Sequence, residues 1–297
     1  MKRDNQCSLA VRAELENESY QSFTKGDVGW KHINFEAKAL KQNQKWEGNT
    51  GENEALFVLL SGNFAATTSA GNFQTVNGRK DVFSGFPYAL YLPPNTDFSI
   101  VAISEQMDLA CGSCKTETHF PARLITPQIV NDFGIELRGG DNASRQINSI
   151  LPPGSPCSHL VCVEVYTPSG NWSSFPAHKH DERKVDPETG KLLEAELEEV
   201  YFYKIDKPQG FAIQQVYTPD RSLNEVAVLR NNDVMLVPRG YHPVVAGHGY
   251  NVYYLNFLAG SDQSLANTPD PDHAWIFDSW KSMDSRLPMI SLEMNNK

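Results

Sequence analysis

Two histidines separated by a single residue, His178 and His180 in the string FPAHKHD, have the spacing of a metal site. Side chains two positions apart on a β-strand point to the same side, so both imidazoles can reach one ion. Glu199 begins the next strong strand, and His242 follows a P-R-G turn. Three histidines and one carboxylate form a ligand set that zinc, manganese and iron(II) all accept. The sequence therefore predicts a divalent metal ion bound by His178, His180, Glu199 and His242.

The same histidines have a simpler interpretation as surface residues of a polar loop. Four charged or polar residues surround them in the sequence: Lys179, Asp181, Glu182 and Arg183. An isolated H-x-H pair occurs by chance in many proteins. The glutamate strand, the P-R-G turn and the third histidine, in that order, favour the metal site.

Strands are the elements that must position these residues. Most of the chain consists of short runs of β-branched and aromatic residues between Gly, Pro, Asn and Asp, which is typical of a β-sandwich or barrel. Helical periodicity is scarce, with short candidates at Pro127–Phe133 and Trp275–Met283. The predicted fold class is all-β, with strands at Leu56–Leu60, Tyr88–Leu92, Leu160–Tyr166, Val200–Ile205, Phe211–Tyr217, Val226–Leu229, Val234–Val237 and Asn251–Phe257.

Some of these features occur twice, at an offset of about 145 residues. A glutamate strand starting at Glu54 resembles the strand that starts at Glu199, and each is followed by a strand that ends in a proline turn, at Pro93 and Pro238. The order of features predicts two barrels in tandem. The expected domains are residues 1–150 and 151–297.

The first copy lacks the metal pattern. No H-x-H pair precedes Glu54, and His32 is a lone histidine there. At the same offset, the counterpart of His242 is Asp97. We therefore expect the N-terminal barrel to bind no metal and to serve packing, an interface or a lid.

Composition limits the function classes. The chain has 297 residues, 40% of them hydrophobic, and a formal net charge of −10, which argues against nucleic-acid and anionic-membrane partners. The longest apolar run, Ala55–Leu60, is far shorter than the roughly 20 residues of a membrane helix. Five cysteines and no visible secretory signal favour a cytoplasmic protein.

The order of the proposed ligands resembles the cupin pattern, in which H-x-H is followed by a glutamate strand and then P-x-G with a histidine. Two departures are visible. The segment from His180 to Glu199 is much longer than in that pattern, and His242 follows its glycine by two positions rather than three. The long segment leaves Glu198 and Glu199 as alternatives, and the family pattern favours Glu199 because the strand V-Y-F-Y follows it directly.

Longer strings extend the comparison beyond the ligands. They are HKHD, LEEVYFYK, GFAIQQVYT, DVMLVPRGYHPVVA and GYNVYYLN in the second half, and GRKDVF, PYALYLPP and RQINSIL in the first. These strings resemble one family in particular, the 5-deoxy-glucuronate isomerases of inositol catabolism. The resemblance covers about residues 29–280 and implies a bicupin aldose–ketose isomerase that converts 5-deoxy-D-glucuronate to 2-deoxy-5-keto-D-gluconate.

Such a reaction needs a group that moves a proton between two carbons. Tyr201, Tyr203 and Glu198 are the candidate catalytic residues, with Tyr254 as a further possibility. Strand alternation places Glu198 opposite to Glu199 unless the strand begins with a bulge. The sequence does not select one base, nor does it separate an enediol from a hydride-shift mechanism.

The implied substrate is an anion, so an acidic protein needs a local cation. Arg239, in the P-R-G turn, and Arg183 are the first candidates for substrate binding, and Arg221 and Lys179 are alternatives. Tyr254 is the candidate for hydrogen bonds to sugar hydroxyls.

Three other functions remain open at this point. They are a 4-deoxy-5-keto-uronate isomerase, an iron(II) dioxygenase and a sugar-binding cupin without activity. The expected partners are a small sugar acid and further copies of the chain in a homodimer or higher oligomer.

Overall fold

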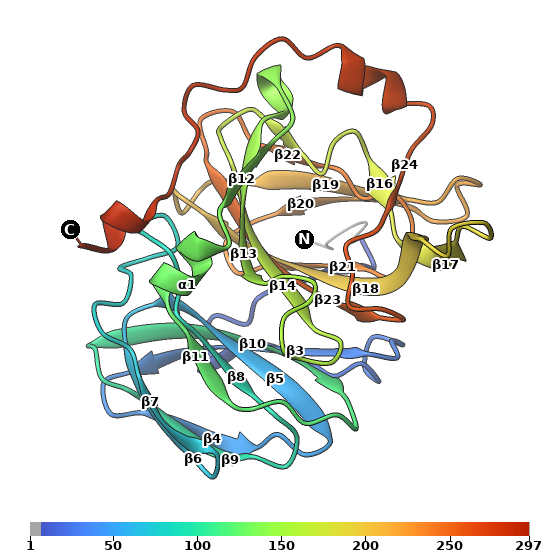
Figure 1. Cartoon of the computed structure of the whole chain (residues 1–297). Helices are drawn as coiled ribbons and strands as arrows, with labels where there is room; N and C mark the ends of the chain where they lie inside the picture. Colours follow the sequence, from blue (N-terminus) through green and yellow to red (C-terminus); the bar gives the residue numbers. More distant parts are fainter. Residues whose placement is uncertain (1–6, 297) are drawn as a thin grey trace, which may run out of the picture. The chain divides into compact units, whose positions relative to one another are not determined.

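Strands make up almost all of the regular structure (Figure 1). The computed structural model describes residues 7–296, which contain 24 strands, the α-helix α1 (Pro127–Asp132) and 3₁₀-helices at Asp141–Ala143, Ala274–Asp278 and Leu292–Asn296. The all-β prediction is confirmed, and every predicted strand coincides with an observed one. The predicted helical segment Pro127–Phe133 is α1, whereas the predicted segment Trp275–Met283 is helical only in its first residues, as part of the 3₁₀-helix at Ala274–Asp278. Thr126 caps α1, whose first residue is Pro127.

The described chain divides into two compact units of interleaved segments. One unit contains residues 7–13, 135–147 and 163–289, and the other contains 14–134, 148–162 and 290–296. The expected boundary after residue 150 stays a prediction. We call the first the histidine unit, because it contains the proposed ligands, and the second the companion unit.

Two sheets form the histidine unit, with the two-stranded pair β16 (His178–Lys179) and β24 (Thr268–Pro269) beside them. The larger sheet has the order β1 (Ala10–Val11), β21 (Val234–Val237), β18 (Leu192–Ile205), β23 (Val252–Gly260), β14 (Val161–Thr167), β13 (Arg145–Leu151) and β12 (Ile135–Arg138), and β17 (Asp181–Val185) pairs with β18. The smaller sheet has the order β15 (Trp172–Ser173), β22 (Val244–Ala246), β19 (Ala212–Tyr217) and β20 (Asn224–Leu229).

The core of the histidine unit lies between its two sheets. Tyr201, Tyr203 and Tyr254 from the larger sheet pack in one buried cluster with Val216 and Val244 from the smaller one. Since side chains alternate along a strand, the residues of β18 on this inner face are the odd-numbered ones. Glu199 therefore belongs to the inner face.

The companion unit repeats this plan. Its larger sheet has the order β11 (Arg123–Ile125), β8 (Ala89–Leu92), β5 (Asn53–Ser61), β10 (Gln106–Lys115), β3 (Ile33–Lys41) and β2 (Ser19–Phe23). Its smaller sheet has the order β4 (Lys45–Asn49), β9 (Asp97–Ala102), β6 (Phe64–Thr68) and β7 (Gly71–Gln74). The core again lies between the sheets, where Phe57 and Leu109 pack with Trp46, Phe64 and Ile100.

Matching strands reveal a one-residue error in the predicted repeat. The series β8-β5-β10 corresponds to β21-β18-β23. Glu199 pairs with Val237, the residue before Pro238, whereas Ala55 pairs with Leu92, the residue before Pro93. Ala55, not Glu54, therefore occupies the inward position that corresponds to Glu199.

None of the helices in the described chain has the length and apolar character needed to cross a bilayer. All five cysteines are buried and free, so no disulfide contributes to either unit.

Candidate metal centre

The H-x-H segment is fixed on both sides by backbone hydrogen bonds. His178 lies on β16 and pairs with Pro269 of β24. Just before it, the carbonyl of Ala177 accepts a hydrogen bond from the Asp270 amide at 2.8 Å. Just after it, the carbonyl of His180 accepts one from the Leu197 amide at 2.8 Å. The two imidazoles thus start from a backbone tied to strands on either side.

A hairpin accounts for the long segment between His180 and Glu199. Strand β17 folds back onto β18, so that Asp181 pairs with Glu196, and the turn closes with a hydrogen bond from the Asp186 amide to the Lys191 carbonyl at 2.8 Å. The hairpin brings Glu199 beside His180 despite their separation in sequence. In the companion unit only residues 50–52 separate β4 from β5, so the ligand-bearing segment has no counterpart there.

His242 enters from the turn after β21. Gly240 in that turn has φ +88°, and a Cβ there would lie 2.5 Å from the carbonyl oxygen of Tyr217, so only glycine fits. Tyr217 and Tyr241 exchange two backbone hydrogen bonds of 2.8 Å. The Gly240 amide also donates to Oδ2 of Asp181 at 2.8 Å. Asp181 therefore connects the turn that carries His242 to the strand that follows His180.

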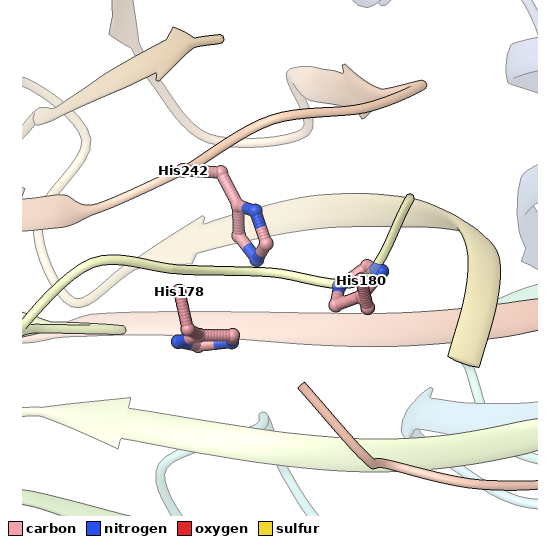
Figure 2. Close-up of side chains that lie close together, drawn as sticks. All are labelled: His178, His180 and His242. Carbon is pink, nitrogen blue, oxygen red and sulfur yellow. The ribbon is translucent and has the colours of Figure 1, made fainter. Parts of the chain in front are cut away.

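These elements bring the three histidines together (Figure 2). One ligand nitrogen from each of His178, His180 and His242 lies within 4.8 Å of the others. Glu199 joins them: its Oε2 atom is 2.9 Å from Nε2 of His180 and 3.3 Å from Nε2 of His242. His242 is fully buried, and His180 and Glu199 are nearly so.

The hydrogen bonds of two histidines fix which nitrogen of each ring points inward. Nδ1 of His180 lies 3.2 Å from the Leu197 carbonyl, and Nδ1 of His242 lies 2.9 Å from the Gly240 carbonyl. A carbonyl only accepts, so each Nδ1 carries a proton and each Nε2 is directed toward Glu199. Nε2 of His180 lies within hydrogen-bond distance of Oε2 of Glu199, at 2.9 Å. Nε2 of His242 is buried and makes no hydrogen bond with any described residue.

The carboxylate of Glu199 and the Nε2 atoms that face it are held together by a positive charge, either a proton on His180 or a metal ion. Two ligand atoms about 2.1 Å from one ion, at right angles, are about 3.0 Å apart, close to the two separations from Glu199 Oε2. The residues present therefore fit a divalent metal ion.

Electrostatics favour the ligating forms of His178 and Glu199. Burial would lower the pKa of His180, but the hydrogen bond to Glu199 outweighs it and raises the pKa, so a metal ion would have to displace a proton there. Burial and the neighbouring histidines lower the pKa of His178 well below its usual value, so this imidazole is neutral at pH 7. Burial alone would raise the pKa of Glu199, but interactions with His180 and His242 outweigh it and lower the pKa. The site therefore offers a carboxylate and a neutral imidazole, as metal binding requires.

Comparison with known proteins identifies the family. Residues 9–276 match the KduI/IolB family. This chain belongs to that family. It is 40% identical over 257 residues to a protein of Geobacillus thermodenitrificans named 5-deoxy-glucuronate isomerase, covering 86% of this chain and 90% of the relative. A Bacillus subtilis protein of the same name is 36% identical over 249 residues, covering 83% and 88%.

Solved structures give the same family and fold. An IolB-like protein from Salmonella typhimurium is 36% identical, with a TM-score of 0.84 over 91% of this chain and 99% of that chain. Oxalate decarboxylase from Bacillus subtilis, a cupin, has a TM-score of 0.58 at 12% identity, over 90% of this chain and 80% of its own. At that identity the likeness shows the fold alone, and the cupin prediction is confirmed.

In this KduI/IolB chain, a row of tyrosines lies next to the histidines. The ring centroid of Tyr201 is 5.7 Å from that of His242 and 4.8 Å from that of Tyr254. The Tyr201 and Tyr254 hydroxyls lie 3.0 and 3.4 Å from Oγ of Ser174. The Tyr203 hydroxyl instead donates to Oε1 of Gln214 at 2.8 Å. Burial raises the pKa of all three phenols, so they are proton donors at neutral pH.

Three predicted site residues lie elsewhere. The register of β18 with β23 runs without a bulge from Leu197 to Ile205, so Glu198 is on the face opposite Glu199, and its catalytic role stays a prediction that this placement does not support. Arg183 is half exposed and paired with Asp262 at 2.9 Å. Arg239 lines a surface pocket of about 320 Å³ that none of the three histidines lines.

The sequence analysis did not single out Arg145 as a site residue. This arginine of β13 is only 8% exposed, and its Nη1 donates to the Phe175 carbonyl at 3.2 Å, three residues before His178. One feature of the sequence could have indicated it. Arg145 and Ile147 are two positions apart on a strand and so share a face, and Ile147 is a member of the inner core.

Proposed function

We propose that this protein is a metal-dependent isomerase that converts 5-deoxy-D-glucuronate to 2-deoxy-5-keto-D-gluconate in inositol breakdown. The observation that carries the proposal is the convergence of Glu199 and the Nε2 atoms of His180 and His242 on one point. The convergence occurs in a chain 40% identical to proteins named 5-deoxy-glucuronate isomerase.

His178, His180, Glu199 and His242 would hold the metal ion, which can be zinc, manganese or iron(II). When bound, the ion supplies positive charge that polarises the substrate carbonyl and stabilises negative charge on its oxygen. The protein's own part is to keep Glu199 ionised and His178 neutral, as their pKa shifts indicate.

Tyr201 is the proposed proton donor of the reaction. An aldose–ketose isomerase must move hydrogen from C2 to C1 and protons between the two oxygens. The Tyr201 phenol is protonated at neutral pH, is next to His242, and lies 3.0 Å from Ser174, which can replace a transferred proton. Tyr203 and Tyr254 would help to position Tyr201 rather than transfer protons. The Tyr203 hydroxyl is hydrogen-bonded to Gln214, and the Tyr254 ring packs against Tyr201.

Burial of these groups also serves the chemistry. Tyr201 and Tyr254 are at most 2% exposed and His242 is fully buried, so little bulk water reaches the reacting centre. A dry site strengthens each electrostatic contact and protects a reactive intermediate from side reactions.

Proton NMR of the purified protein with 5-deoxy-D-glucuronate in D₂O tests the proposal. We expect turnover to the 2-deoxy-5-keto acid, its loss on adding EDTA, and its return on adding a divalent metal. Deuterium at C1 of the product would indicate proton transfer through an enediol, whereas its absence would indicate a hydride shift. A metal-loaded protein that leaves the substrate unchanged would contradict the proposal and direct attention to other uronates and to oxygen consumption.

A further inference from the structure

Arg145 is a buried cation on the inner face of the histidine unit. It shares its face of β13 with Ile147, which packs in the core cluster that includes Tyr201 and Tyr254. Its exposure is 8%. Arginine is seldom buried to this extent unless an anion faces it, because removing its charge from water costs free energy.

No carboxylate of the described chain is paired with this guanidinium, although Glu136 of β12, itself paired with Arg138, interacts with it electrostatically at longer range. Within residues 7–296, the one side-chain hydrogen bond of Arg145 goes to the neutral carbonyl of Phe175 at 3.2 Å. Its remaining nitrogens make no hydrogen bond within the described residues and are not completely buried. Arg145 therefore keeps donors and a charge available for a ligand.

The position of Arg145 connects it to the metal centre. It holds the carbonyl of Phe175, in the segment that leads to His178. Two serines of that segment form hydrogen bonds with the row of tyrosines. Oγ of Ser173 lies 2.6 Å from the Tyr254 hydroxyl, and Oγ of Ser174 lies 3.0 Å from the Tyr201 hydroxyl. The charge of Arg145 also opposes the rise in the pKa of Tyr254 that burial causes, as expected for close neighbours.

We propose that Arg145 binds the carboxylate of the substrate and so selects sugar acids over neutral sugars. This inference rests on the proposed function, in which the aldehyde end of a six-carbon acid is at the metal and the carboxylate is at the other end. The planar guanidinium can meet a carboxylate with two parallel hydrogen bonds, and burial strengthens them. The two arginines predicted from the sequence are less suited to bind this carboxylate. Arg183 already pairs with Asp262, and Arg239 lines a surface pocket that the three histidines do not line.

Substitution of Arg145 tests the proposal. Glutamine at this position can still donate to the Phe175 carbonyl but has no charge, so Arg145→Gln separates ligand binding from support of the backbone. For 5-deoxy-D-glucuronate we expect kcat/KM to fall about 100-fold, mainly through KM, and to fall less in Arg145→Lys, which keeps the charge without the fork. For the neutral analogue with a hydroxymethyl group in place of the carboxylate, kcat/KM should stay within about twofold of wild type.

Controls distinguish this role from a structural one. Metal content and melting temperature should match the wild type in both variants, and Arg183→Gln, at an exposed paired arginine, should leave all parameters unchanged. An equal loss on the acidic and neutral substrates, or a loss of bound metal in both Arg145 variants, would overturn the proposal.

Binding keeps the inference testable if the wild-type protein does not turn over 5-deoxy-D-glucuronate. Calorimetric titration of the metal-loaded protein with D-glucuronate and with D-glucose then provides the measurement. Preference for the acid in wild type and its loss in Arg145→Gln would support the anion site although the proposed reaction had failed. Equal binding of D-glucuronate by wild type and Arg145→Gln would refute the anion site.

Discussion

At the scale of single residues, two adjacent glutamates provide a matched test of the metal centre. Glu199 faces His180 and His242, whereas Glu198 is on the other face of the same strand. We expect Glu199→Gln to weaken metal binding and reduce kcat by about 100-fold or more, because an amide supplies no negative charge to the ion. Glu198→Gln should change neither by more than about twofold.

Metal analysis after dialysis, together with the NMR assay, checks this pair. If Glu198→Gln lost metal and Glu199→Gln retained it, the assignment of the inner face of β18 would be wrong. The comparison is sharp because both variants carry the same chemical change at neighbouring positions.

Removing a hydroxyl from the tyrosine row should separate chemistry from packing. Tyr201→Phe removes the proposed proton donor, and we expect kcat to fall about 100-fold with metal content unchanged. Tyr203→Phe leaves Oε1 of Gln214 without its donor, so we expect a loss of stability of about 1 kcal/mol and a smaller effect on kcat. Steady-state kinetics and urea unfolding measure the two effects, and a larger kcat loss in Tyr203→Phe would reverse the assigned roles.

At the scale of elements, one buried carboxylate holds the ligand-bearing segment against the barrel. Glu194 of β18 is fully buried and accepts hydrogen bonds from Nζ of Lys179 at 2.8 Å and from Nζ of Lys184 at 3.1 Å. It also accepts from the amide of Asp181 at 3.1 Å and from the hydroxyl of Thr268. Strands β16, β17, β18 and β24 thus meet at one side chain. Lys179, the middle residue of H-x-H, is part of this anchor.

Loss of the Glu194 charge should therefore destabilise the histidine unit. Glu194→Gln leaves the buried Lys179 with less compensation, and we expect the free energy of unfolding to fall by about 3 kcal/mol at pH 7. Burial would raise the pKa of Glu194, but bonds from Lys179, Thr268 and Lys184 outweigh it and lower the pKa from 4.5 to about 2. A lowered folded-state pKa gives stability that is complete above pH 4.5 and is lost as the pH falls toward 2.

Urea unfolding of metal-free wild type and Glu194→Gln between pH 2 and 7 measures this contribution. The difference between the two proteins should be constant near neutral pH and shrink between pH 4.5 and 2. If the difference in unfolding free energy did not depend on pH, the destabilisation of Glu194→Gln would come from altered packing rather than from the lost charge.

The sequence predicted these elements unevenly, for physical reasons. Strands such as β5 and β23 are strongly apolar and bounded by turn residues, so their positions were evident. The side-chain alternation that gathers His178, His180 and Glu199 is also a local property. The anchor at Glu194 and the ligand site at Arg145 depend on contacts between distant strands, for which charged residues in a strand give no local signal. The repeat was misaligned by one residue for the same reason: only strand pairing shows that Ala55, not Glu54, points inward.

At the scale of the whole molecule, the two units use equivalent strands for different purposes. In the companion unit Glu54 faces away from the core and accepts hydrogen bonds from the amides of Ser158, His159 and Leu160, and from the Tyr91 hydroxyl at 2.9 Å. This carboxylate is fully buried and, with the Cys114 thiol at 3.5 Å, has five donors within the described residues, which is the pattern of a structural anchor.

This division of roles predicts one metal ion per chain. The inward position equivalent to Glu199 is Ala55, and the turn at 50–52 replaces the segment that carries His178 and His180. Titration of the metal-free protein, followed by elemental analysis, should give a stoichiometry close to one. His178→Ala together with His180→Ala should remove that ion, whereas Glu54→Gln should lower the melting temperature and leave the stoichiometry at one. Two ions in the wild-type protein, one of which survives the double histidine substitution, would instead place a second metal site outside the histidine cluster.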